Sequence, residues 1–134
     1  MPEQTTTLHD LQAAVARFVS ERDWDVYHTP KSLSMSVAIE AAEIMELFQW
    51  HGNEASRAVA ADPAWQAELA GELADVLIYA LALANVSEID AGEAVLTKLA
   101  RNQQRFPPGQ LPSRHKALDK TESTQKEEAS DEQL

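Results

Sequence analysis

The sequence predicts an all-α fold, on three observations. Apolar residues recur with helical spacing through most of the chain, no convincing strand pattern occurs, and capping or helix-breaking residues such as Thr7, Pro30 and Pro63 divide the periodic segments. The 134 residues favour one domain. Their 44% hydrophobic content supports a modest core, which small helical chains often complete by oligomerisation.

The first helix is predicted to run from the capping residues 5–7 to about Arg22, because its apolar residues share one face. Those residues are Leu8, Leu11, Val15, Phe18 and Val19. Residues 24–31 are predicted to be a linker, since Pro30 disfavours helical geometry at Thr29.

The second helix (residue 32 or 34 to 50) and the third (about 64–86) are apolar nearly all round, so both are expected to be buried. A short helical piece is predicted at 54–61 and a fourth helix at about 91–105. The helical core is predicted to span residues 1–110. The polar segment 111–134 is predicted to be a disordered acidic tail.

The formal charge of −11, from 22 acidic and 11 basic residues, restricts the partners. Such a surface repels nucleic acid and anionic membranes, so neither is expected as a partner. A phosphate-bearing substrate would need metal ions or a local group of Lys and Arg. The absence of cysteine excludes thiolate chemistry. With no signal pattern and no apolar run near 20 residues, the protein is expected to be cytoplasmic.

Carboxylates interrupt the two most apolar helices. Glu40 and Glu43 are three residues apart, as are Glu72 and Asp75, so each pair projects from one helical face. If the helices pack antiparallel, four carboxylates converge, and their burial is tolerable when they coordinate a cation. Oxygen ligands without Cys or His suit Mg²⁺ or Mn²⁺. Solvated helix faces are the alternative that this pattern leaves open.

A ferritin-like di-iron site is disfavoured, because it needs Glu-x-x-His pairs. None of the four histidines has a Glu three residues earlier.

These residues resemble the signature of the MazG-like, all-α nucleoside triphosphate pyrophosphohydrolases: Glu40-x-x-Glu43, 28 intervening residues, then Glu72-x-x-Asp75. The flanking segments resemble the dCTP pyrophosphatase branch of that family. They are Glu21-Arg-Asp-Trp24, His28-x-Pro30, Glu46-Leu-Phe-Gln-Trp50, Asp75-Val-Leu-Ile-Tyr79 and Lys98-x-x-x-Asn102-x-x-Arg105-Phe-Pro107. The resemblance covers roughly residues 8–108.

The resemblance implies hydrolysis of a deoxynucleoside triphosphate between its α and β phosphates. It implies a four-helix core that assembles as a dimer or tetramer, with Glu40, Glu43, Glu72 and Asp75 holding Mg²⁺. Glu43 is our choice for the residue that orients the attacking water, and Glu46 continues the same helical row.

The resemblance also implies substrate-binding residues. Trp24 and Trp50 are expected to stack on the base, and His28 to donate to the base or a phosphate. Tyr79 is expected to pack on the sugar and disfavour a 2′-hydroxyl. The remaining candidates are the phosphate-binding cations Lys31, Lys98, Arg101 and Arg105, and the nucleotide contact Asn102. Taken without the resemblance, Trp50 fits a core role equally well, and the cations of the fourth helix fit solvated positions.

We expect dCTP to be the preferred substrate, with 5-modified dCTP also accepted. Val15 departs from the branch, which is expected to have a histidine near the base at this position. A pyrophosphohydrolase of broad or different base specificity is therefore an alternative. A non-enzymatic helical interaction module is the alternative of another class.

Overall fold

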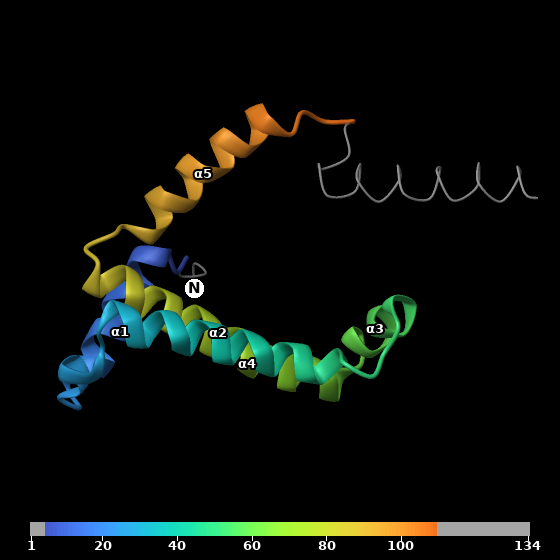
Figure 1. Cartoon of the computed structure of the whole chain (residues 1–134), viewed down its shortest axis with the longest axis horizontal. Coiled ribbons are helices and arrows are strands. Elements are labelled where there is room, and N and C mark those ends of the chain that lie inside the picture. The colour runs from blue at the N-terminus through green and yellow to red at the C-terminus, as the bar shows by residue number, and fades with distance from the viewer. Residues whose placement is uncertain (1–4, 110–134) are drawn as a thin grey trace, which may run out of the picture. The chain divides into compact units, whose positions relative to one another are not determined.

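The computed structural model describes residues 5–109, which contain helices and no β-strand. The elements are α1 (Leu8–Ser20), the 3-10 helix η1 (Trp24–Tyr27), α2 (Pro30–Phe48), α3 (Asn53–Ala60), α4 (Pro63–Val86) and α5 (Ala91–Arg105) (Figure 1). The all-α prediction is confirmed. The predicted acidic tail, 111–134, lies outside the described residues. The chain divides into two compact units, Met1–Ala94 and Val95–Leu134, and each is described by itself.

Side-chain caps set the starts of the first two long helices. At α1 the Asp10 amide donates to the Thr7 hydroxyl oxygen over 3.2 Å, and the Thr7 amide donates to the Asp10 carboxylate over 2.8 Å. This reciprocal arrangement is a capping box. At α2 the Thr29 hydroxyl oxygen accepts from the Ser32 amide, and Pro30 occupies the first helical position, where its missing N–H costs nothing.

The segment predicted as a linker is more ordered than expected. Four of its residues form η1, and α2 begins at Pro30 instead of at residue 32 or 34. Thr29 is extended (φ −86°, ψ 154°), as expected before proline. The first helix ends at Ser20, two residues before the predicted end, and Asp23 adopts a left-handed conformation (φ 54°) that reverses the chain.

Helices α2 and α4 pack side by side in opposite directions, and α1 packs on α4. The direction follows from two pairings. Phe48, at the end of α2, packs against Trp65 at the start of α4, with ring centroids 5.8 Å apart. Glu43, earlier in α2, meets Glu72, later in α4. His51 packs edge-on against Trp65 at 5.2 Å, so an aromatic group fastens this end of the helix pair.

The hydrophobic core lies at the other end of the pair, where α1 covers α4. Its buried residues are Val15, Val19, Leu33, Leu81 and Ala82. Branched aliphatic side chains from α1 and the first turn of α2 here meet the last third of α4. This end of the helix pair therefore contains the buried core of the chain.

The expectation that the second and third helices are buried was wrong for the single chain. In α2 only Leu33 is buried, while Ile39 and Met45 are 58% and 71% exposed. In α4, Leu73 and Leu77 are about half exposed. Two helices packed as a pair bury only the stripes that face each other, so an all-round apolar helix keeps an apolar face. Length and composition alone would also let α4 cross a membrane, a test that soluble core helices pass as well.

Candidate functional site

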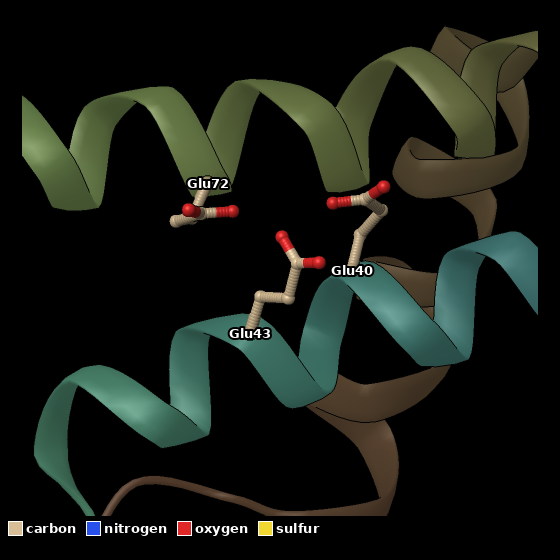
Figure 2. A group of neighbouring side chains, drawn as sticks. All are labelled: Glu40, Glu43 and Glu72. Carbon is tan, nitrogen blue, oxygen red and sulfur yellow. The ribbon is translucent and has the colours of Figure 1, made fainter.

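Three of the predicted metal-binding carboxylates come together between α2 and α4. One carboxylate oxygen from each of Glu40, Glu43 and Glu72 lies within 4.8 Å of the others. Figure 2 shows Glu40 and Glu43 rising from successive turns of α2 toward α4, with Glu72 projecting from α4 to meet them. The antiparallel packing and the spacing of three residues thus bring together three of the four carboxylates that the sequence predicted to converge.

Within residues 5–109, no basic side chain forms an ion pair with the carboxylates of this group. One oxygen of Glu72, Oε2, is buried without a hydrogen-bond partner. Neither of the two ion pairs among residues 5–109 involves this group, because they join Arg22 to Glu21 and Arg57 to Glu54. A buried carboxylate oxygen needs a proton or a cation beside it. The group therefore fits a hard divalent cation such as Mg²⁺ or Mn²⁺, which prefers oxygen ligands.

The surroundings raise the pKa of two carboxyl groups in this cluster, Glu72 and Glu40. A hydrogen bond with Glu43 raises the pKa of Glu72 above its ordinary value, and burial and the charges of Glu43, Asp75 and Glu40 add to the effect. Burial is the first cause that raises the pKa of Glu40, followed by the charge of Glu43. Without a metal, these side chains therefore hold protons more tightly than solvated glutamates do.

Asp75 lies beside the three glutamates without belonging to their cluster. Its charge contributes to the raised pKa values of Glu40 and Glu72, so it is within electrostatic reach of both. Its side chain also lines an adjacent pocket of about 240 Å³. Asp75 is therefore a pocket residue that also lies within electrostatic reach of the carboxylate group.

The pocket is built from α1, η1 and α4, together with His28, which follows η1. Its lining comprises Val15, Phe18, Val19, Trp24, His28, Asp75, Ile78, Tyr79 and Ala82. Three predicted substrate-binding residues, Trp24, His28 and Tyr79, are thus brought together here. An apolar pocket with an indole, an imidazole and a phenol at its wall suits a flat heterocycle with polar edges.

Four pocket residues have positions that the sequence did not indicate: Phe18, Val19, Ile78 and Ala82. Phe18 is the aromatic one among them. It was expected only as part of the apolar face of the first helix, and the same helical spacing gives no sign that its ring faces a cavity. Val15 was singled out as a departure from the family. Its side chain is buried (9% exposed) and offers the pocket no hydrogen-bonding group.

The other predicted substrate-binding residues lie elsewhere in the described chain. Lys31 is exposed on the first turn of α2, and Trp50, in the turn after α2, is 88% exposed and outside the pocket. Lys98, Asn102 and Arg105 belong to the second unit, where their spacing of four and three residues aligns them on one face of α5. Their predicted roles remain predictions.

Comparison with known proteins identifies the family of this chain. The model of the MazG-like family matches residues 35–128, more than half of the chain. The chain belongs to the MazG-like family. The matched region includes both acidic pairs and therefore the whole carboxylate group. The family resemblance inferred from the motifs is confirmed.

Curated relatives are similar over 101 residues, which make up 75% of this chain. The dCTP pyrophosphatase 1 proteins of Bos taurus and Mus musculus are 41% identical to it, and that of Homo sapiens is 40% identical. The chain spans only about 60% of the length of these relatives.

A solved structure is also similar. A pyrophosphatase from Archaeoglobus fulgidus superposes with a TM-score of 0.69 at 36% identity, covering 80% of this chain and 98% of that one. The helical arrangement of this chain thus recurs in a pyrophosphatase of which it covers nearly the whole length.

Proposed function

We propose that this protein hydrolyses a deoxynucleoside triphosphate between its α and β phosphates, releasing the monophosphate and pyrophosphate. The observation that carries the proposal is the position of Asp75. Its charge acts on Glu40 and Glu72, and its side chain lines the pocket that contains Trp24. A group of carboxylates suited to a metal therefore adjoins an aromatic pocket suited to a base. A nucleoside triphosphate would place its base in the pocket and its phosphates at the metal, so the two sites have to be neighbours.

Glu40, Glu43, Glu72 and Asp75 would hold Mg²⁺, with Mn²⁺ as an alternative. The bound cation would neutralise the carboxylates, accept phosphate oxygens and make a bound water more acidic. Glu43 is the proposed catalytic residue. Its carboxylate accepts a hydrogen bond from the attacking water and takes the water's proton as the phosphoanhydride bond breaks. The bonding electron pair leaves with the pyrophosphate.

The pocket residues supply recognition in this proposal. Trp24 stacks on the base, His28 donates to the base or a phosphate, and Tyr79 packs on the sugar, where its ring disfavours a 2′-hydroxyl. The further proposed substrate contacts are Lys31, Trp50, Lys98, Asn102 and Arg105.

The preferred substrate in this proposal is dCTP, and 5-modified dCTP is accepted as well. The name of the curated relatives, dCTP pyrophosphatase 1, supports this choice. Val15 supports a second candidate, a broad or different base specificity, because an aliphatic side chain in the pocket cannot hydrogen-bond to the edge of a base. Both candidates share the reaction and differ only in the base.

A homo-oligomer in the cytoplasm, either a dimer or a tetramer, completes the proposal. Apolar side chains such as Ile39, Met45 and Leu77 are too exposed for a chain that works alone, which supports self-association. The net charge of −11 argues against nucleic acid and anionic membranes as partners. Sedimentation of the purified protein tests the oligomer, and a single species of monomer mass at micromolar concentration would contradict it.

The activity is tested by pyrophosphate release from a panel of the common NTPs and dNTPs, with and without Mg²⁺. We expect Mg²⁺-dependent release, fastest with dCTP. Comparable release from several triphosphates would retain the reaction and favour the broad-specificity candidate. No release from any triphosphate would contradict the proposed activity and favour a helical interaction module. That module also predicts an unchanged melting temperature with Mg²⁺ and nucleotide, whereas a binder is stabilised by its ligand.

A further inference from the structure

Phe18, which lines the pocket, contacts a positively charged group and an aromatic group. The guanidinium carbon of Arg22 lies 3.7 Å from the centroid of the Phe18 ring, and the Arg22 side chain also donates to the Phe18 carbonyl oxygen over 3.0 Å. The ring of Trp24 meets Phe18 edge-on, with centroids 5.7 Å apart and planes at 75°. These are favourable geometries for a cation–π contact and for an aromatic pair.

The path of the chain explains how residues so close in sequence face one another. Phe18 lies in the last turn of α1, and the left-handed conformation of Asp23 (φ 54°) turns the backbone before Trp24 begins η1. Trp24 is therefore folded back onto α1. It is held there by a short 3-10 helix with no side-chain cap, which is a weak local restraint.

Trp24 needs an external restraint if its indole is to face the pocket in one orientation. The indole is 44% exposed, and Phe18 is 45% exposed, so neither ring is locked by a closed core. Both rings line the same pocket. The Phe18 ring can therefore fix the orientation of the Trp24 indole in the pocket. Arg22, which lies over the Phe18 ring, restrains that ring in turn.

We infer that Phe18, covered by Arg22, is a positioning residue that orients Trp24 for stacking on the base of the nucleotide. The inference rests on the proposed function, since it takes the pocket to be the base site. It differs from a purely structural role for Phe18, in which the ring only fills space on the apolar face of α1. A structural role predicts lower stability, and a positioning role predicts weaker nucleotide binding that depends on Trp24.

The test is a double-mutant cycle in the full chain, with KM and kcat measured for the best triphosphate of the panel. Phe18→Leu keeps an apolar side chain and removes the ring. We expect it to raise KM about fivefold, the equivalent of losing one aromatic pair, with little change in kcat. Phe18→Tyr, which keeps an aromatic ring, should have the wild-type KM. In a Trp24→Ala background, Phe18→Leu should raise KM no further.

Leu11→Ala is the matched control, because Leu11 is similarly exposed (41%) on α1 and lines the neighbouring apolar groove without lining the pocket. It should leave KM unchanged. Equal effects of Phe18→Leu with and without Trp24 would overturn the inference. So would a fall in kcat and melting temperature at constant KM.

A spectroscopic measurement separates this inference from the proposed activity. In a chain carrying Trp50→Phe and Trp65→Phe, the tryptophan fluorescence and the indole bands of the near-ultraviolet circular dichroism report Trp24 alone. Phe18→Leu should change both signals, since the ring beside the indole is lost. Unchanged spectra would overturn the positioning of Trp24 even in an active enzyme. Changed spectra in a protein that releases no pyrophosphate would keep the contact and reject its role in nucleotide binding.

Discussion

Glu43 of α2 and Glu72 of α4 meet across the helix pair, and the hydrogen bond between their side chains is the main cause that raises the pKa of Glu72. Two carboxylates can share such a bond only when one of them carries a proton. The Oε2 atom of Glu72 is buried and has no hydrogen-bond partner within the described residues. The pair is therefore a site that either a proton or a metal cation can stabilise, and these two occupants compete.

The first prediction is that metal-free protein loses stability as the pH rises. A raised pKa means that the folded state binds the proton of Glu72 more tightly than the unfolded state does. The stabilising contribution is complete below the ordinary glutamate value, 4.5, and is lost as the pH rises through the raised value. Melting temperatures in chelator should therefore fall over this range more in the wild type than in Glu72→Gln.

Mg²⁺ should reverse this loss, because the cation replaces the proton between the ionised carboxylates. We expect Mg²⁺ to raise the melting temperature at neutral pH and to have a smaller effect at acidic pH. Glu54→Gln is the matched control, since Glu54 is exposed on α3 and, within residues 5–109, its one ion pair is with Arg57. An equal Mg²⁺ response in wild type and Glu72→Gln would argue against the metal site.

The second prediction concerns turnover. Glu43→Gln keeps the shape of the side chain but cannot take a proton from water, so kcat should fall by about 10²–10⁴-fold while the fold persists. Asp75→Ala should abolish turnover as well, because Asp75 links the carboxylate group to the pocket. Glu54→Gln should retain the wild-type rate. Near-normal kcat in either site variant, measured by pyrophosphate release, would remove that residue from the site.

The third prediction separates binding from chemistry. Trp24→Ala removes the indole from the pocket, and the loss of stacking on the base, about 1–3 kcal/mol, should raise KM by roughly 5- to 150-fold. The effect on kcat should be small, since the substitution leaves all four proposed metal-binding carboxylates in place. Trp65→Phe controls for the loss of an indole at the aromatic end of the helix pair. An unchanged KM in Trp24→Ala would exclude Trp24 from the base site.

The helices and the acidic pairs could be predicted because both are periodic. A spacing of three residues puts Glu40 and Glu43 on one face of any α-helix, and the same holds for Glu72 and Asp75. Only the direction in which the two helices pack had to be assumed. The convergence of Glu40, Glu43 and Glu72 then follows, and the structure confirms it.

The pocket could be predicted only in part, because non-periodic geometry builds it. The segment from Trp24 to Tyr27 is too short to show a helical period. An aspartate such as Asp23 does not by itself predict a positive φ, which glycine adopts more readily. The contact of Phe18 with Trp24 depends on this turn. Burial was overestimated for a similar reason, since an apolar residue such as Met45 shows hydrophobicity without showing which partner covers it.

The last prediction concerns Gln12, a buried polar residue of α1 that joins three segments of the first unit. Its amide nitrogen donates to the Asn85 side-chain oxygen over 3.1 Å and to the Ile89 carbonyl oxygen over 2.9 Å. Its side-chain oxygen accepts from the Ala91 amide over 3.0 Å. Every polar atom of this side chain is paired, so the residue fastens α1 to the turn between α4 and α5.

Gln12→Leu should lower the free energy of unfolding by on the order of 2 kcal/mol, because the partly buried polar groups that Gln12 satisfies lose their partner. For a domain of this size, a loss of 1 kcal/mol lowers the melting temperature by roughly 4–8 °C. His9→Ala, one turn away and exposed, is the control. Gln12→Glu keeps the acceptor for Ala91 but loses both donors, so it too should destabilise. If the melting temperature of Gln12→Leu matched that of the wild type, the turn between α4 and α5 would not depend on the hydrogen bonds of Gln12.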